Sequence, residues 1–112
     1  MKVVRHNEVI PYEAKGHFDV RTSRICNKDM CDADHMIMGI SWFLPGGGAE
    51  YSKVGPNAEL IYYIAEGEMT VTTDDGSFVL KKGDSVFFKE GDGRSVKNES
   101  SEPAAMLVVI SK

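Results

Sequence analysis

The chain has 112 residues, of which 42% are hydrophobic and 27% are charged, as is typical of one soluble globular domain. Its formal net charge of −4 argues against a basic surface for nucleic acid or membranes. The longest apolar run, 104–110, is too short to cross a bilayer, and the first residues lack a stretch of signal-peptide length. We therefore expect a cytoplasmic protein with a small-molecule partner and no nucleic-acid or membrane partner.

Alternating apolar and polar residues predict strands over 18–25 and 35–44, joined by a loop. One face of the second strand is entirely apolar, so we expect it to point inward: Met36, Met38, Ile40, Trp42 and Leu44. The other face is also largely apolar, which indicates cover on both sides, for example by a second subunit.

The run Pro45-Gly46-Gly47-Gly48 is expected to end that strand. Further short strands follow, separated by turns such as Asp75-Gly76: 59–65, 69–73, 77–80, 85–88, 94–98 and 104–110. Such a series of short strands predicts an all-β sandwich or barrel with little or no helix.

The barrel is expected to cover residues 18–112, preceded by an N-terminal arm over 1–17. The arm carries several strand-forming apolar residues, which could add to the sheet edge of a second copy of the chain: Val3, Val4, Val9, Ile10 and Tyr12. We therefore predict a homodimer, with the arm as a candidate part of its interface.

Residues 45–110 resemble the cupin superfamily, whose fold is the double-stranded β-helix, or jelly-roll, barrel. The resemblance rests on segments typical of its two motifs: 45–48, 62–68 and 83–88, together with Gly91, Asn98 and the closing segment 102–109. It covers about two-thirds of the chain. It implies a cupin barrel with a small-molecule pocket inside.

Cupins normally bind a metal through histidines and a glutamate, but the matching positions here carry other residues. The glutamate position falls on Leu60 and the last histidine position on Arg94. The first two histidine positions fall on Lys53 and Gly55, or on Val54 and Pro56, depending on the spacing. The resemblance therefore implies a metal-free member without a cofactor.

Arg94 is the most informative replacement, because the resemblance points it into the barrel mouth. A guanidinium group offers five donors in a fork that suits a carboxylate or a phosphate. The alternative is that Arg94 reaches solvent or pairs with Asp92 or Glu90.

The other candidate ligand-binding residues each have an ordinary structural alternative. Lys53 is a base if it is desolvated and a solvated loop lysine otherwise. Tyr51 and Tyr62 offer pocket hydroxyls or core packing, and Trp42 and Met38 offer apolar pocket walls or core packing. Arg24 shares its strand face with Phe18, Val20 and Thr22, so it needs an acidic partner, a ligand or water at the barrel end. No catalytic residue is assigned.

Cys26 and Cys31 are separated by four residues and could face each other across a hairpin. A disulfide is geometrically possible there, but a reducing compartment favours two free thiols.

Three functions fit this sequence. The first is a metal-free barrel that binds a small anionic or carbonyl metabolite, with isomerase, dehydratase or lyase activity as suitable reaction classes. The second is a non-catalytic binding or sensory barrel. The third is a metal-dependent cupin that recruits unusual ligands such as His35, Glu59 or Tyr51.

Overall fold

The computed structural model describes residues 1–112 and contains nine strands, one short α-helix and one 3-10 turn. The helical elements are η1 (His6–Glu8) and α1 (Lys28–Cys31). The strands are β1 (Ile10–Tyr12), β2 (His17–Cys26), β3 (Met36–Lys53), β4 (Glu59–Glu66), β5 (Glu68–Thr73), β6 (Gly76–Lys81), β7 (Ser85–Phe88), β8 (Gly93–Lys97) and β9 (Ala104–Ser111). The predicted all-β architecture with little helix is confirmed.

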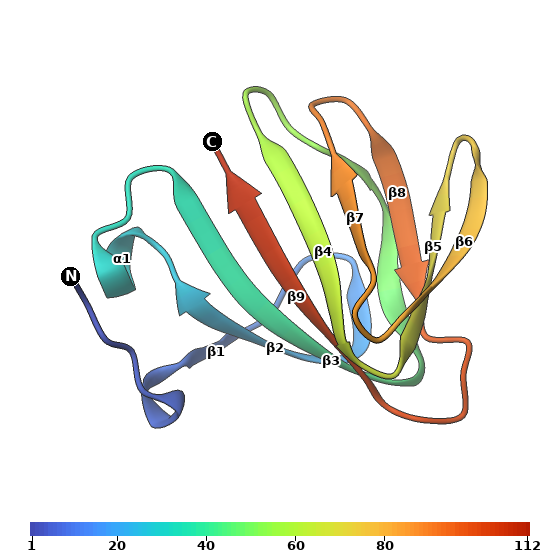
Figure 1. Ribbon diagram of the computed structural model, residues 1–112, viewed down its shortest axis with the longest axis horizontal. Coiled ribbons are helices and arrows are strands. Elements are labelled where there is room, and N and C mark those ends of the chain that lie inside the picture. The colour runs from blue at the N-terminus through green and yellow to red at the C-terminus, as the bar shows by residue number, and fades with distance from the viewer.

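All strand pairs are antiparallel, and the sheet curls into a nearly closed barrel with the strand order β6-β5-β8-β3-β9-β4-β7 (Figure 1). The first half of β3 pairs with β9 on one edge and with β2 on the other. Its second half pairs with β8 instead of β9. One strand therefore belongs to both walls of the jelly roll, as expected for this fold.

The prediction that Pro45–Gly48 ends the strand is wrong, because β3 continues through this segment to Lys53. Gly46 adopts a φ of +85°, and its N–H donates to the Asn98 carbonyl oxygen at 2.7 Å. The Asn98 N–H in turn donates to the Gly47 carbonyl oxygen at 2.7 Å. The glycines thus bend the strand without releasing it from the sheet.

The core lies between the two walls of the barrel and is formed by twelve buried apolar residues: Phe43, Val54, Ala58, Leu60, Tyr62, Ile64, Met69, Val71, Phe88, Val96, Ala104 and Met106. The alternation of β4 supplies three of them, as the resemblance implied. Such a core gives the barrel a rigid wall on which polar groups at the mouth can be held.

The predicted inward face of residues 35–44 is wrong. Phe43 points inward and is 1% exposed, whereas its neighbours Trp42 and Leu44 are 38% and 58% exposed. Gly39 and Ser41 share the inward face with Phe43 and are buried. Both faces of the strand carry apolar residues, so alternation alone could not tell inside from outside.

The N-terminal segment folds onto its own chain, because β1 pairs with β2 and places Tyr12 opposite Thr22. The Thr22 hydroxyl donates to the Tyr12 carbonyl oxygen. Between β2 and β3, Asn27 caps α1 by accepting from the Met30 N–H at 2.9 Å, where we expected only a loop. Whether the N-terminal segment also touches a second copy remains a prediction. Neither helical element is long enough to cross a membrane.

Candidate functional site

Arg94 points into the open end of the barrel. It shares the inward face of β8 with buried Val96, two residues further along the strand. Its Nε donates to the Tyr62 hydroxyl at 3.0 Å, and its Nη1 donates to the Ser52 carbonyl oxygen at 2.8 Å. The guanidinium group is therefore held in place by two elements, β4 and β3, and is half-buried.

No carboxylate neutralises this cation. The three ion pairs of the structure all lie elsewhere on the surface: Lys28–Asp32, Lys28–Asp34 and Lys82–Glu66. Of the two acidic residues weighed as partners, Asp92 accepts from the Lys89 N–H at 2.8 Å, and Glu90 accepts from the Asn57 N–H at 2.5 Å. Both carboxylates thus hold loops, and Arg94 keeps an uncompensated positive charge.

Tyr62 lies beneath Arg94 on the inward face of β4 and is 6% exposed. Its ring meets the Phe88 ring edge-on, with centroids 5.4 Å apart. Burial raises the pKa of the Tyr62 hydroxyl, while Arg94 acts against this shift and the nearby Tyr12 phenol adds to it. The hydroxyl is therefore neutral at pH 7. Because its oxygen accepts from Arg94, its own proton is free for a ligand oxygen.

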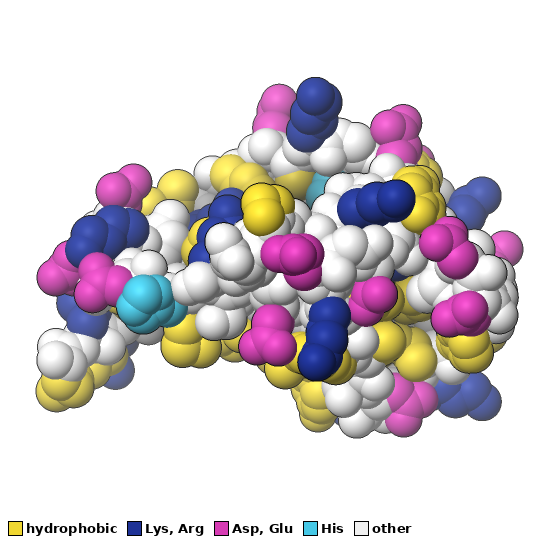
Figure 2. All heavy atoms as spheres, turned by 90° about the horizontal axis from the view of Figure 1, so that it is seen from above, with side chains coloured by type: hydrophobic (Ala, Val, Ile, Leu, Met, Phe, Trp, Pro, Cys, Tyr) yellow, Lys and Arg dark blue, Asp and Glu magenta, His cyan; other side chains and the backbone are white.

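A cavity of about 290 Å³ opens beside Arg94 at the same end of the barrel. Its lining combines three basic residues with apolar ones and contains no acidic side chain: Lys53, Val54, Gly55, Pro56, Ala58, Leu60, Arg94, Ile110 and Lys112. Figure 2, the view onto this end, shows basic and acidic side chains across the surface with apolar atoms between them. The cavity itself is basic.

Arg24 and Tyr12 form a second arginine–tyrosine pair on the inward face of β1 and β2. The Arg24 guanidinium carbon lies 4.0 Å from the centroid of the Tyr12 ring. The inward direction of Arg24 agrees with its predicted parity with Val20 and Thr22. The same prediction is wrong for Phe18, because a bulge between Phe18 and Val20, where Asp19 has a φ of +49°, turns Phe18 outward.

The side chains of the remaining predicted site residues point away from the Arg94 guanidinium group. Tyr51 is exposed, and its hydroxyl donates to Asp74 at 3.4 Å. Trp42 faces outward, with the Arg21 guanidinium carbon 5.9 Å from its ring centroid. Met38 shares this outer face of β3. Of the seven candidates, the structure thus gathers Arg94, Tyr62 and Lys53 around one end of the barrel, with Arg24 on the same inner surface.

Sequence reasoning missed Tyr12 and Lys112 as parts of this region. Tyr12 belongs to a three-residue strand whose pairing with β2 carries no local signal. Lys112 follows β9, and its N–H donates to the His35 carbonyl oxygen at 2.9 Å, which fixes it at the mouth.

The donor set at the barrel mouth does not fit a metal. No group of three His, Cys, Asp or Glu side chains converges anywhere in the chain. Leu60 and Arg94, at two of the family's metal-ligand positions, both face inward. A hydrocarbon side chain and a positively charged guanidinium group provide no lone pair that could coordinate a metal ion. The Nδ1 atoms of His17 and His35 lie 3.1 Å from the backbone oxygens of Lys15 and Lys112.

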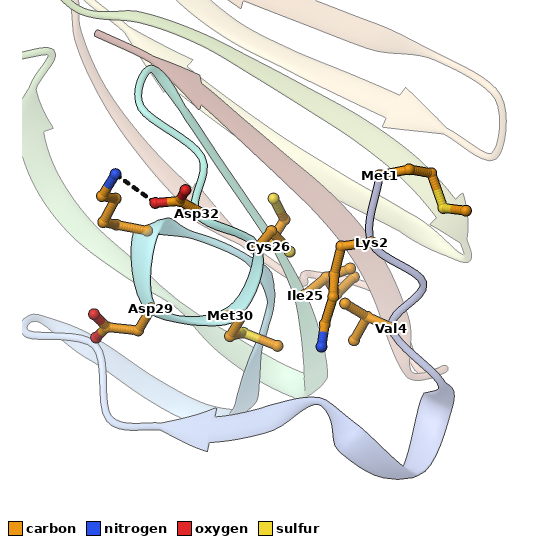
Figure 3. A pocket seen from close by; sticks show the side chains of 10 residues that line it. Met1, Lys2, Val4, Ile25, Cys26, Asp29, Met30 and Asp32 are labelled. Atoms are coloured by element: carbon orange, nitrogen blue, oxygen red, sulfur yellow. Dashed lines mark ion pairs between the residues drawn. The ribbon is translucent and has the colours of Figure 1, made fainter.

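A wider cavity of about 1000 Å³ lies outside the barrel, between the N-terminal segment and α1 (Figure 3). Met1, Lys2 and Val4 border it from one side, and Ile25, Cys26 and Met30 border it from the other. Cys26 and Cys31 are both free, and a hydrogen bond with the Cys31 thiol is the main cause that raises the pKa of Cys26. This cavity shares no residue with the basic one.

Comparison with known proteins identifies one family and one curated relative. The family model of the cupin domain matches residues 41–110. A β-D-galactosidase of Mycobacterium tuberculosis is 32% identical over 110 residues, which cover 98% of this chain and 93% of that protein.

Solved structures agree with the fold. A predicted oxalate decarboxylase from Thermotoga maritima superposes with a TM-score of 0.81 at 22% identity, covering 98% of each chain. The polyketide cyclase RemF from Streptomyces resistomycificus superposes with a TM-score of 0.84 at 18% identity, covering 99% of this chain and 79% of that one.

Proposed function

This chain belongs to the cupin family, and we propose that its barrel binds a small anionic or carbonyl metabolite without the help of a metal. The observation that carries the proposal is Arg94, a half-buried guanidinium group inside the barrel with no carboxylate partner. A cation held beside apolar surface is costly unless an anion meets it. A ligand carboxylate supplies that anion.

The site contains the groups that binding and simple proton chemistry require. Arg94 offers the guanidinium donors that its bonds to Tyr62 and Ser52 do not use. Tyr62 stays neutral and donates its proton to a carboxylate or carbonyl oxygen. Lys53 and Lys112 add positive charge at the cavity wall. Isomerisation, dehydration and carbon–carbon lysis all pass through anions that such donors stabilise.

The donor set supports metal independence. Fe, Mn, Ni and Zn require imidazole, thiolate or carboxylate ligands, and the cavity lining holds none of these side chains. We expect titration with these ions to leave the melting temperature unchanged. A stoichiometric ion whose binding is lost on changing His35 or Glu59 would support the metal-dependent alternative.

The relatives favour two different substrates. The predicted oxalate decarboxylase supports a small carboxylate, in line with Arg94. The mycobacterial β-D-galactosidase supports a galactoside as the second candidate. Glycosidases commonly use a pair of carboxylates at the scissile bond, and the basic cavity has none, so we favour the carboxylate.

Calorimetric titration with small carboxylates, keto acids and sugar phosphates tests the proposal directly. We expect Arg94→Ala to leave the fold intact and to weaken binding of the best ligand by ten-fold or more. Arg94→Lys is expected to restore only part of the affinity that Arg94→Ala loses, because an ammonium group cannot make the two-point contact with a carboxylate. Arg21→Ala, a change on the outer face, serves as the matched control.

Two results would decide against the proposal. Unchanged ligand affinity in Arg94→Ala would exclude Arg94 as the anchor. Hydrolysis of a chromogenic β-D-galactoside by the wild type, with no binding of any anion, would favour the second candidate. Binding without turnover of any compound in the panel would instead identify a sensory or carrier barrel.

We expect the protein to act in the cytoplasm. A reducing compartment matches the two free thiols of Cys26 and Cys31.

A further inference from the structure

Two arginines, not one, face the interior of this barrel without a carboxylate partner. The Arg94 Nε donates to the Tyr62 hydroxyl at 3.0 Å. The Arg24 guanidinium carbon lies 4.0 Å from the centroid of the Tyr12 ring. Neither takes part in any of the three ion pairs of the chain. Each guanidinium group is oriented by an aromatic neighbour and left with unused donors.

The strand register places the two pairs at the same level of the inner surface. Arg24 lies opposite Gly39, Gly39 opposite Val108, and Val108 opposite Tyr62, on the adjacent strands β2, β3, β9 and β4. Neighbouring strands are about 4.8 Å apart, so the Cα atoms of Arg24 and Tyr62 are separated by roughly 14 Å along the sheet. Arg94 approaches the Tyr62 end of this row from the opposite wall.

The surface between the two pairs is formed by Gly39, the Tyr12 hydroxyl and Val108. Gly39 has no side chain, and the Tyr12 hydroxyl lies 3.8 Å from the point where a Cβ atom on Gly39 would be. Val108 packs against the core and offers only its methyl groups. The row therefore has a cation at each end, a phenol beside each cation, and the Tyr12 hydroxyl and the Val108 methyl groups in the middle.

We propose that Arg24 and Tyr12 form the second half of the binding site, so that the ligand is a dicarboxylate with a short aliphatic body. This inference rests on the proposed anion-binding function and adds the number and spacing of the anionic groups. One carboxylate binds the Arg94 end, the other binds the Arg24 end, and the methylene groups lie over Val108, beside the Tyr12 hydroxyl. Tyr12 is a positioning residue that holds the Arg24 guanidinium group.

Calorimetry with a length series of dicarboxylates, from malonate to adipate, tests the spacing. Each compound is compared with the monocarboxylate of equal length and with inorganic phosphate. We expect one dicarboxylate to bind at least ten-fold more tightly than its monocarboxylate. Arg24→Gln should abolish this advantage while leaving monocarboxylate affinity within two-fold, whereas Arg94→Gln should weaken both.

Tyr12 variants separate positioning from general stability. Tyr12→Leu is expected to reduce the dicarboxylate-to-monocarboxylate ratio, and Tyr12→Phe, which keeps the ring under Arg24, is expected to restore it. Arg21→Gln, on the outer face of the same strand, should change neither affinity.

The outcomes distinguish this inference from the function on which it rests. If monocarboxylates bind through Arg94 but Arg24→Gln leaves dicarboxylate affinity unchanged, the two-ended site is wrong and the anion site stands. If phosphate binds more tightly than every dicarboxylate, the two-ended site is likewise overturned. If no anion binds at all, both are excluded.

Discussion

The hydrogen bond from Arg94 Nε to the Tyr62 hydroxyl joins residues that are 32 positions apart and lie on opposite walls of the barrel. It fixes the direction of the guanidinium group and leaves the phenolic proton available to a ligand. The two residues therefore act as one unit, and a change in either should alter the other.

Tyr62 is expected to titrate at a pH above the usual range of a tyrosine. Burial raises its pKa above the usual value of 10.0. An acid whose pKa is higher in the folded state stabilises that state below the unfolded pKa, and the stabilisation is lost as the pH rises through the folded pKa. We expect phenolate absorbance to show one late tyrosine, absent in Tyr62→Phe.

The matched control is Tyr63→Phe, which removes an exposed tyrosine from the same strand. This variant should keep the late-titrating phenol of Tyr62. Loss of the late phenol in Tyr63→Phe would contradict the assignment.

Gly48→Ala is expected to destabilise the fold. A Cβ atom at Gly48 would lie 2.2 Å from the Val96 carbonyl oxygen, so β3 and β8 must separate. Overpacking of this kind typically costs about 1–3 kcal/mol of unfolding free energy. Gly55→Ala is the control, because its Cβ meets nothing within 4 Å. Urea unfolding of both variants measures the difference. Equal urea midpoints would show that β3 and β8 accommodate the added Cβ atom without loss of stability.

We predict a homodimer through the outer sheet face formed by Ile61, Tyr63 and Phe87. Ile61 lies opposite Phe87 and Val109, so these side chains form a continuous exposed apolar patch across β7, β4 and β9. Light scattering at tens of micromolar should show a dimer and, for Ile61→Lys, a monomer. Val79→Lys, an exposed change on β6, should remain dimeric. A monomeric wild type would refute this prediction.

Cys26 is expected to react slowly with alkylating reagents at neutral pH. The hydrogen bond with the Cys31 thiol, and after it burial, raises the pKa of Cys26 above its usual value of 9.0. Cys31→Ala removes the first cause and should accelerate the alkylation of Cys26, followed by intact mass against pH. A rate for Cys26 that is equal in the wild type and the variant would rule out the role of Cys31.

The sequence predicts most strands, because their turns are marked by glycine, proline and aspartate. The inward direction of Tyr62 follows from the resemblance to the cupins, which places Leu60 inside the barrel, because Tyr62 lies two residues further along on the same strand face. The direction of residues 35–44 could not be predicted, because apolar residues on both faces make the alternation ambiguous. Tyr12 escaped prediction because only pairing between β1 and β2 brings it to the barrel.

The two-walled strand β3 has a consequence for the dynamics of the molecule. It pairs with β2, β8 and β9, whose residues run from His17 to Ser111. The backbone hydrogen bonds of β3 can therefore all form only after nearly the whole chain has folded. Such non-local pairing slows folding, and β3 can open only when its pairing with strands on both sides is lost. The amides of β3 should therefore be among the last to exchange with deuterium, at a rate close to that of global unfolding.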